Sequence, residues 1–229
     1  MDWLVAIWWV TTQKNGASAL GLQNVLGIKS HQTAWTWLHK IRRAMVNPNR
    51  LKLSGTVEVD EVYVGGESIG KRGRGLENKV VVAVAAELDG KKLGRCRMSI
   101  VDDASASSLH AFIIENVETA SHLITNDWSG FNGIEKHGYS REVQTQKNQK
   151  AYDELLPHVH TIVSLLKRWL LGTHQGAVEP KHLQSYLDEY VFRFNRRKSA
   201  ERGLLFYRLL ECAMQTKTIT YKNLTKHSI

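Results

Sequence analysis

The sequence predicts an α/β protein in which a sheet is flanked by helices and preceded by a small helical segment. Residues 56–66 alternate apolar and polar side chains, as a strand with one buried face does. Residues 80–88 form a continuous apolar run suited to a central strand, whereas residues 181–197 repeat apolar side chains at helical spacing. The chain has 229 residues, enough for one sizeable domain and a small accessory module.

Residues 1–48 are expected to form the helical segment. The first helix carries an apolar face that includes Trp3, Ile7 and Trp8, and we expect this helix to be buried. Its apolar run is far shorter than the ~20 residues that span a bilayer. Because Asp2 stands where a basic region would begin and no small-residue cleavage site follows, a signal peptide is not expected either.

Two further helices follow, each with a capping signal. Ser18 and Ser30 stand directly before helical runs, where a serine side chain can accept a hydrogen bond from the first turn. Two helices joined by a short glycine-containing turn, the second with a basic end, form the helix-turn-helix pattern of DNA-binding segments. Trp35 and Leu38 are expected to lie in the core of this segment rather than to contact bases.

The rest of the chain orders its elements as three strands, a helix, a strand and then helices. This is the order of a ribonuclease-H-like fold, with helices on the faces of a mixed sheet. We expect this domain to span residues 51–214 and a C-terminal tail to span residues 215–229. The expected strands are residues 56–66, 80–88, 91–101 and 121–127, and the expected helices are residues 105–117, 160–172, 181–197 and 201–214.

The charge of the chain points to a polyanionic partner. The 31 Lys and Arg residues outnumber the 22 Asp and Glu residues, which gives a net charge of +9. This balance favours nucleic acid as a partner, and a merely soluble basic protein is the alternative. Cys96 and Cys212 lie far apart without CxxC spacing, which argues against a zinc site or a disulfide scaffold and fits a reducing cytoplasm.

Acidic residues interrupt the first expected strand. Glu58 and Asp60 share one face of it, and Glu61 points the other way. Because acidic side chains are unfavourable in strand interiors, either this is a solvated strand edge or the acids have a chemical role. Asp127 ends the fourth expected strand, where open α/β sheets place ligands, although a turn or helix-capping aspartate is the alternative. We expect Asp60 and Asp127 to lie side by side on neighbouring strands.

Carboxylates in this arrangement can bind a divalent metal. Mg²⁺ prefers oxygen ligands and is typically held by one or two carboxylates together with substrate phosphate. Two Mg²⁺ ions about 3.5–4 Å apart can activate the attacking oxygen and stabilise the leaving oxygen in phosphodiester chemistry. Asp60, Asp127 and a third ligand from a later helix would hold these ions, and Mn²⁺ can take the place of Mg²⁺.

Helix 160–171 offers a candidate for the third ligand. Burial of its apolar face turns His160 and Lys167, which are seven residues apart, together toward the opposite side. His160 would then face the metals while Lys167 reaches the phosphate backbone, and a capping histidine with a solvated lysine is the alternative. Glu154 is a rival third ligand.

Basic residues are expected to form a phosphate-binding surface. Glu189, Arg193 and Arg196 follow helical spacing beside a core stripe, a pattern that either steadies the helix or presents the arginines to DNA. The expected DNA-binding residues are Lys71, Arg72, Arg74, Lys167, Arg168, Glu189, Arg193, Arg196 and Arg197, and Lys198 adds a further positive charge to the expected surface.

Several long motifs occur in one order along the chain. They are VEVDEVYVGG, TNDWSGF, LLKRWLLGTHQGAV and KHLQSYLDEYVFRFNRR, and TTQKNGASALGLQNVLG and TAWTWLHKIRRAM precede them. In these motifs the sequence resembles bacterial transposases of the insertion-sequence fifteen-ninety-five family, whose catalytic domain is ribonuclease-H-like. The resemblance covers nearly the whole chain.

The resemblance implies a role for each residue that matches a family motif. Asp60 and Asp127 match the two metal-binding aspartates of the family, and Lys167 matches the basic residue that follows the third ligand. The Glu-Arg-Arg signature of the family is matched by Glu189, Arg193 and Arg196.

Two departures from the family pattern bear on activity. The third ligand of the family is usually Glu or Asn, whereas this chain has His160, and a neutral imidazole binds Mg²⁺ less readily than an oxygen ligand does. The family also usually begins with a zinc ribbon bearing paired cysteines, which this sequence lacks, so we expect the chain to be N-terminally shortened.

The resemblance implies a DDE-type transposase that cleaves DNA and transfers the cut strand with the help of two metal ions. A catalytically dead or shortened remnant that only binds DNA or a full-length partner is one alternative. A ribonuclease-H-like nuclease that cuts without joining is another. The implied partners are the element ends, target DNA and further copies of the chain on DNA, in the bacterial cytoplasm with the nucleoid and away from membranes.

Overall fold

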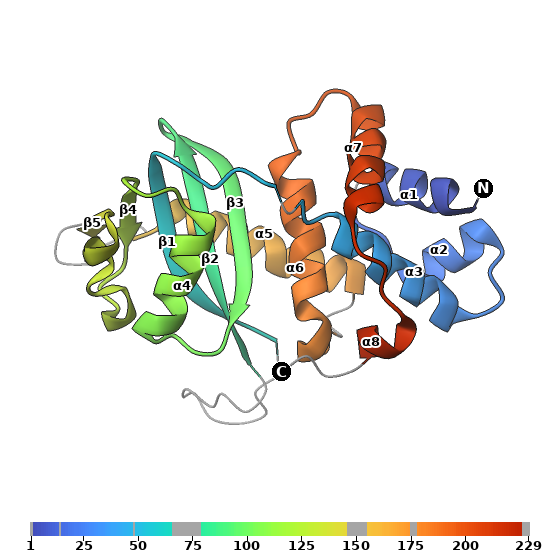
Figure 1. The fold of residues 1–229 in the computed structure, drawn as a ribbon, viewed down its shortest axis with the longest axis horizontal. Coiled ribbons are helices and arrows are strands. Elements are labelled where there is room, and N and C mark those ends of the chain that lie inside the picture. The colour runs from blue at the N-terminus through green and yellow to red at the C-terminus, as the bar shows by residue number, and fades with distance from the viewer. Residues whose placement is uncertain are drawn as a thin grey trace. The chain divides into compact units, whose positions relative to one another are not determined.

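The chain divides into two structural units, one built around a sheet and one made of helices (Figure 1). The computed structural model describes residues 2–13, 15–47, 49–65, 79–145, 155–174 and 178–225, without the side chain of Arg202. The sheet unit is Leu51–Lys167, and the helical unit combines Met1–Arg50 with Arg168–Ile229. Residues 168–214, which the sequence analysis assigns to the domain of the sheet, are grouped with the N-terminal helices in this division.

The sheet unit contains five strands in the order β3-β2-β1-β4-β5. β1 is antiparallel to β2 and β2 to β3, whereas β1 is parallel to β4 and β4 to β5. This mixed arrangement is ribonuclease-H-like and confirms the expected fold class. The strands are β1 (Thr56–Val64), β2 (Val80–Asp89), β3 (Lys92–Val101), β4 (His122–Thr125) and β5 (Ser140–Val143).

The edge strand β5 is the one strand of the sheet that the sequence analysis did not predict. Its four residues, Ser140–Val143, include a single apolar side chain, so neither alternation nor an apolar run marks it. It forms because β4 presents a free edge with which these residues pair, Thr125 lying opposite Val143. Two short 3₁₀ helices, Ser129–Phe131 and Ile134–His137, connect β4 to β5.

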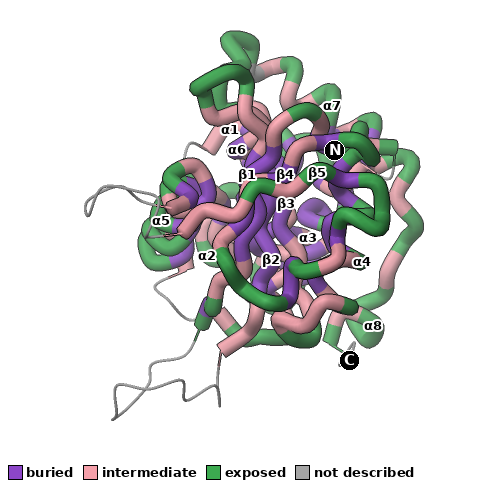
Figure 2. Tube along the Cα trace, turned by 90° about the vertical axis from the view of Figure 1, so that its left-hand side faces the viewer, coloured by how far each residue is buried: buried purple, intermediate pink, exposed green. Residues whose placement is uncertain are grey.

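Helix α4 (Ala106–Asn116) covers one face of the sheet. Ser105 caps it by accepting a hydrogen bond from the Ser108 N–H at 3.4 Å. The buried interior of this unit runs through the strands and α4 (Figure 2). Substitution of one such large buried aliphatic side chain by alanine typically lowers the free energy of unfolding by about 2–5 kcal/mol. The core residues include Leu53, Val57, Val59, Ala83, Ala85, Leu109, Phe112, Ile113 and Leu123.

The other face of β1 carries the acidic residues. Val57 and Val59 point toward the α4 core, so Glu58 and Asp60, which alternate with them, lie on the opposite face. The first turn of α5 (Pro157–His174) lies against that face, because backbone N–H groups of this turn bond to Glu58. The boundary between the two units falls within α5.

The helical unit begins with the three expected helices, α1 (Asp2–Thr12), α2 (Ala19–Leu26) and α3 (His31–Ala44). Both predicted caps are confirmed: Ser18 accepts from Gly21 N–H at 3.1 Å and Ser30 from Thr33 N–H at 3.4 Å. The remaining helices are α6 (Pro180–Asn195), α7 (Arg202–Gln215) and α8 (Tyr221–Thr225), the last of which lies in the expected tail. Leu38 is buried as predicted, and the shared core includes Leu22, Leu38, Ile41, Phe192 and Leu209.

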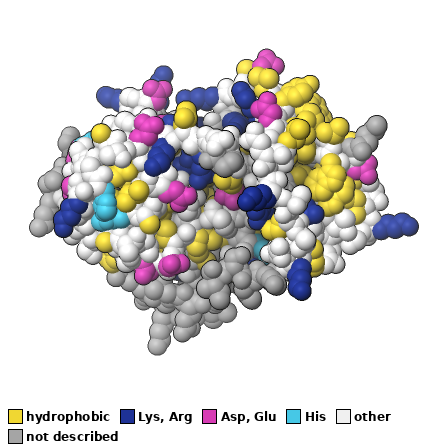
Figure 3. All heavy atoms as spheres, in the orientation of Figure 1, with side chains coloured by type: hydrophobic (Ala, Val, Ile, Leu, Met, Phe, Trp, Pro, Cys, Tyr) yellow, Lys and Arg dark blue, Asp and Glu magenta, His cyan; other side chains and the backbone are white. Residues whose placement is uncertain are grey.

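Helix α1 is less buried than the sequence analysis predicts. Ile7 and Val10 are buried, but Trp3 and Trp8 are 40% and 50% exposed. Trp3 stacks on Trp37 at 4.0 Å between ring centroids, so one face of each indole still reaches solvent. Figure 3 shows apolar side chains gathered over α1 and α7. Among the described helices, none is long and apolar enough to cross a membrane.

Candidate active site

Asp60 is a buried carboxylate at the centre of the sheet unit. It is 6% exposed and lies on β1, between β2 and β4, so the solvated-edge alternative is wrong. Its Oδ1 accepts hydrogen bonds from the Asn126 side-chain amide at 2.9 Å and from the Glu61 N–H at 3.0 Å. Its Oδ2 lies 3.6 Å from Nε2 of His160.

Burial makes the ionised form of Asp60 costly. Burial raises the pKa of the Asp60 carboxyl to about 6, and the nearby charge of Glu58 adds to the rise. The Glu61 N–H and His160 act in the opposite direction and lower this pKa, because both stabilise the carboxylate. A cation next to Asp60 would offset the remaining free-energy cost of ionising this carboxyl. A buried carboxylate of this kind is therefore suited to a metal site.

The residue that follows β4, Asn126, is the neighbour of Asp60. The last pair of the parallel β1–β4 ladder is Val59 with Thr125, so the next residues along the two strands, Asp60 and Asn126, come side by side. The 2.9 Å hydrogen bond between their side chains follows from this register. Sequence reasoning placed Asp127 beside Asp60 and missed Asn126, one residue earlier.

Asp127 lies in the loop after β4 and is exposed. The loop is held from β5 by Arg141, which donates to Oγ1 of Thr125 at 2.8 Å and to the carbonyl of Asn126 at 3.1 Å. Burial lowers the pKa of Arg141, and the charge of Asp127 is among the influences that raise it, so the two side chains interact electrostatically. The loop therefore leaves the side chain of Asp127 exposed, one residue beyond Asn126.

Glu58 does not join Asp60 as a free carboxylate. Its Oε2 accepts from the backbone N–H groups of His158 and Val159, at 2.9 and 3.0 Å. Its Oε1 lies 2.6 Å from Nδ1 of His158. Glu58 is 3% exposed, and all of these partners belong to the first turn of α5. Sequence reasoning noticed Glu58 but could not find its partners, which are about a hundred positions away.

His160 lies in the first turn of α5 beside Asp60, with 41% of its side chain exposed. The opposite face of α5 is buried through Ile162, Leu166 and Leu170, in agreement with the predicted apolar face. Leu165, another apolar residue of this helix, is 38% exposed. Lys167 and Arg168 are exposed, and the rival ligand Glu154 lies outside the described residues.

Glu61 points to the α4 face of the sheet, away from Asp60, as the alternation predicts. Burial raises the pKa of its carboxyl to about 7, and the charge of Asp60 raises it as well. Its Oε2 is buried and has no hydrogen-bond partner among the residues that the structure describes. The protonated acid is therefore well populated near neutral pH.

Asp60 and His160 supply part of the donor set that a divalent cation requires. Within the described part of the chain, no three His, Cys, Asp or Glu side chains are gathered closely enough to hold a metal ion. Asp60 and His160 are nevertheless adjacent, and Oδ2 of the desolvated Asp60 carboxylate lies beside His160. Mg²⁺ needs only one or two protein carboxylates and completes its shell with water and phosphate. The residues at Asp60 thus fit a divalent cation.

The expected Glu-Arg-Arg stripe of α6 is only partly available to DNA. Glu189 is fully buried and bonds to Arg42 at 2.7 Å and to Arg193 at 2.9 Å. Arg193 also donates to the carbonyls of Val10 and Gln13, at 2.8 and 2.7 Å. The geometry of Glu189 and Arg193 therefore favours the structural alternative left open by the sequence, because these side chains bind α1 and α3 to α6.

The charged partner Arg42 was missed by sequence reasoning. It lies one position after the buried Ile41 of α3 and is 2% exposed, which is unusual for an arginine. Burial alone would raise the pKa of Glu189, but the charges of Arg42 and Arg193 hold this pKa below its ordinary value. The signal in the sequence was an arginine on the apolar stripe of a helix.

Other expected DNA-binding residues lie at the end of α6 or beyond the described structure. The guanidinium of Arg196 lies 4.0 Å from the ring centroid of Phe192, and that of Arg197 lies 4.0 Å from the ring of Phe194. Arg197 and Lys198 are exposed. Lys71, Arg72 and Arg74 lie outside the described residues.

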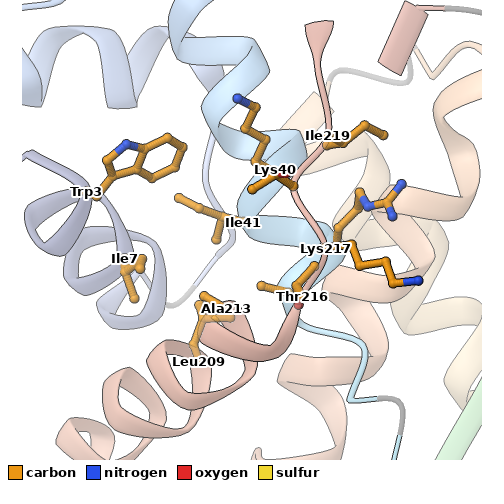
Figure 4. Close-up of a pocket in the computed structure, with 12 residues that line it drawn as sticks. Trp3, Ile7, Lys40, Ile41, Leu209, Ala213, Thr216, Lys217 and Ile219 are labelled. Carbon is orange, nitrogen blue, oxygen red and sulfur yellow. The ribbon is translucent and has the colours of Figure 1, made fainter. Parts of the chain in front are cut away.

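The helical unit contains a cavity of about 340 Å³ between α1, α3 and α7 (Figure 4). Apolar side chains such as Ile7, Ile41 and Leu209 line it, with Lys40 and Lys217 at its rim. It has no carboxylate in its lining, so it offers no ligand set for a hard cation.

Comparison with known proteins identifies one family model and several distant structures. The family model of the ISXO2-like transposase domain matches residues 52–195. A chain of a simian T-cell lymphotropic virus intasome in complex with PP2A regulatory subunit B56 gamma has a TM-score of 0.37 and 11% identity, over 76% of this chain and 65% of that chain. This protein thus spans less than two thirds of the viral chain.

Two Mos1 structures are similarly distant. The Mos1 strand transfer complex has a TM-score of 0.40 and 11% identity, over 95% of this chain and 79% of that chain. A pre-cleavage Mos1 transpososome has a TM-score of 0.35 and 11% identity, over 95% and 80% of the two chains. No curated protein matches the chain.

Proposed function

The chain belongs to the ISXO2-like transposase domain family, and on this premise we propose that it is a DDE-type transposase that cleaves DNA and joins the cut strand to a target. The observation that carries the proposal is the buried Asp60 carboxylate, held by Asn126 and facing His160. A desolvated carboxylate that lies beside an imidazole, on β1 where the neighbouring parallel strand β4 ends, can control the charge on a phosphate oxygen.

Family membership implies a divalent metal, and we assign its ligands to Asp60, Asp127 and His160. Two Mg²⁺ ions, or Mn²⁺ in their place, would supply the positive charge that activates the attacking oxygen and stabilises the leaving oxygen. Asp60 contributes a carboxylate whose position is set by two hydrogen bonds. Asp127 contributes the exposed carboxylate, which the Arg141 contacts hold at the edge of the site.

His160 serves in this proposal as a neutral ligand from α5. An imidazole donates through one nitrogen only when that nitrogen carries no proton, so the site requires Nε2 of His160 to be unprotonated. Nε2 is the nitrogen that faces Asp60, at 3.6 Å. Lys167, exposed seven residues later on the same helix, binds a phosphate of the DNA backbone.

The reaction that this site would serve has two steps. In the first, water attacks the phosphodiester at the end of the element, which breaks the P–O3′ bond and leaves a free 3′-hydroxyl. In the second, this 3′-hydroxyl attacks a phosphodiester of the target, and the target's own 3′-oxygen leaves with the proton. Lys167, Arg168, Arg196 and Arg197 are the described residues that we assign to the DNA backbone, and further copies of the chain are proposed to assemble on it.

A DNA-binding remnant without catalysis is the second candidate. Two observations favour it: the described residues contain no preformed cluster of three metal-binding side chains, and a histidine stands at the third position. Cleavage of DNA separates the two candidates, because both of them bind it.

The decisive experiment uses a labelled duplex that carries the inverted repeat flanking the gene. The full chain is incubated with this duplex, a target plasmid and Mg²⁺ or Mn²⁺. A transposase produces a 3′-hydroxyl end and a joined product, and Asp60→Asn removes both. Cleavage without joining would indicate a nuclease, and binding without cleavage would indicate the remnant.

A further inference from the structure

Glu58 connects two elements that carry the site. Its side chain is 4% exposed and belongs to β1, whereas its three partner atoms belong to the first turn of α5. Oε2 accepts from His158 N–H at 2.9 Å and Val159 N–H at 3.0 Å, and Oε1 lies 2.6 Å from Nδ1 of His158.

These bonds satisfy a specific need of the helix. The first N–H groups of a helix have no partner within it, and a side chain just before the helix usually supplies one. Here the residue that begins α5 is Pro157, which has no N–H, and the next two N–H groups both bond to Glu58. A carboxylate at this end is also favoured by the helix dipole. The cap of α5 therefore comes from a strand rather than from the preceding loop.

The cap determines where His160 lies. Asp60 is two residues after Glu58 on the same face of β1, and His160 directly follows Val159 in the capped turn. The two tethered N–H groups thus hold this turn against β1, and Nε2 of His160 comes to 3.6 Å from Oδ2 of Asp60.

From this arrangement we propose that Glu58 is a positioning residue, which docks the first turn of α5 on β1 and so places His160 beside Asp60. Glu58 acts through His160 and does not bind the metal itself, since both of its oxygens are engaged by α5. The proposal rests on the proposed function, because it concerns the geometry of the same metal site.

The test measures Mn²⁺ binding by the full chain, from the electron paramagnetic resonance signal of free Mn²⁺, alongside DNA cleavage. Loss of a residue that orients a metal ligand typically costs about 10–100-fold in metal affinity. We therefore expect Glu58→Ala to weaken Mn²⁺ binding at least about tenfold, as His160→Ala does, and the double variant to be no weaker than His160→Ala alone.

Glu58→Gln separates positioning from direct ligation and keeps the test usable if the alanine variant fails to fold. The amide oxygen can still accept from both N–H groups, and the amide nitrogen can donate to His158. We expect this variant to retain Mn²⁺ affinity within about threefold of the original chain, since the shape of the contact survives. An affinity as low as that of Asp60→Asn would make Glu58 a ligand and overturn the proposal.

Glu87→Ala is the matched control. Glu87 lies on β2 and accepts from Ser54 N–H and from Arg95, so its loss also removes a carboxylate that bonds to a backbone N–H. This control is expected to lower the melting temperature but to leave Mn²⁺ affinity unchanged.

Two further kinds of outcome would also overturn the proposal, and they differ in whether the proposed function is overturned as well. Unchanged Mn²⁺ affinity in Glu58→Ala, with the expected losses in Asp60→Asn and His160→Ala, would reject the positioning role and leave the proposed function standing. Absence of Mn²⁺ binding by the original chain, or equal binding by Asp60→Asn, would reject both.

Discussion

Asn126 donates a hydrogen bond from its side-chain amide to Oδ1 of Asp60 at 2.9 Å, and its own Oδ1 accepts from the Trp128 N–H at 3.0 Å. One side chain therefore holds the buried carboxylate and also shapes the loop that carries Asp127. This relationship makes Asn126 part of the site, although neither its residue type nor its position marked it in the sequence.

Substitution of Asn126 is expected to disturb both functions of its side chain. Asn126→Ala removes one of the two hydrogen bonds that Oδ1 of the buried Asp60 carboxylate accepts, which should lower the free energy of unfolding by about 1–3 kcal/mol. DNA cleavage should fall as well, because the Asp127 loop loses its bond to Trp128. Urea unfolding and cleavage assays would measure the two effects. Asn132→Ala, which removes a contact of Arg141 only, is the control, and equal losses in both variants would argue against a special role for Asn126.

The stability of the metal-free protein should depend on pH through Asp60. Burial raises the pKa of this carboxyl from 3.8 to about 6, so between these values the folded protein keeps a proton that the unfolded chain releases. At this group the stability is therefore highest below pH 3.8, where both states hold the proton, and it falls as the pH rises from 3.8 to about 6. Glu61, with its pKa raised to about 7, extends this loss to higher pH.

Asp60→Asn removes the titration of Asp60. Relative to the original chain, the variant should gain roughly 2–3 kcal/mol of stability between pH 4 and pH 8. Urea unfolding at the two pH values would measure this gain. The same difference between variant and original chain at pH 4 and at pH 8 would contradict the assignment of a raised pKa to Asp60.

Divalent metal should stabilise the protein most where Asp60 is ionised. Binding to the folded state alone adds about 2.7 kcal/mol at a metal concentration one hundred times Kd. The melting temperature should therefore rise with Mg²⁺ or Mn²⁺, and the rise should be larger at pH 8 than at pH 5. Asp60→Asn and Asp127→Asn should each reduce the rise and abolish cleavage. Full cleavage by either variant would remove that residue from the site.

The buried cluster of Glu189, Arg42 and Arg193 should stabilise the helical unit. Glu189→Ala leaves the almost fully buried Arg42 without its carboxylate partner, a change that typically costs about 3–5 kcal/mol. Because the pKa of Glu189 is lowered, its contribution is present at neutral pH and is lost as the pH falls through the lowered pKa. Thermal unfolding would measure the change. Glu211→Ala, which breaks an exposed pair with Arg208, is the control and should have little effect.

The salt dependence of DNA binding should distinguish the arginines of α6 and its end. Loss of one phosphate contact reduces the log–log salt slope by about 1. We expect this reduction for Arg197→Ala and for Lys167→Ala, whose side chains are exposed. Arg193→Ala should leave the slope unchanged, because its guanidinium is engaged by Glu189, Val10 and Gln13. A flatter slope in Arg193→Ala would place this residue on the DNA instead.

Much of the fold could be predicted because its signals are local. Ser18, Ser30 and Ser105 cap helices through bonds to N–H groups three residues away, so a short window of sequence contains both partners. β1 to β4 were predicted from alternation and apolar runs. β5 was not, because its four residues become a strand only when β4 offers its edge.

The sequence predicted which charged residues face the candidate site, but it did not predict which groups they contact. Alternation placed Glu58 and Asp60 on one face, and helical spacing placed His160 opposite the buried side of α5. The sequence could not show that Glu58 caps α5, that Asn126 rather than Asp127 touches Asp60, or that Glu189 is buried against Arg42.

By itself, the sequence determined the order of β1 to β4 and of α1 to α7, the serine caps of α2 and α3, and the face on which each acidic residue of β1 lies, since these depend on periods of two to four residues. The tertiary structure alone decided which polar groups meet. Glu58 and His158 are 100 positions apart and Arg42 and Glu189 are 147 apart, so their pairing follows from how strands and helices pack. Burial then determined the chemistry, because a carboxylate has an ordinary pKa in water and a raised one inside the sheet, as Asp60 has.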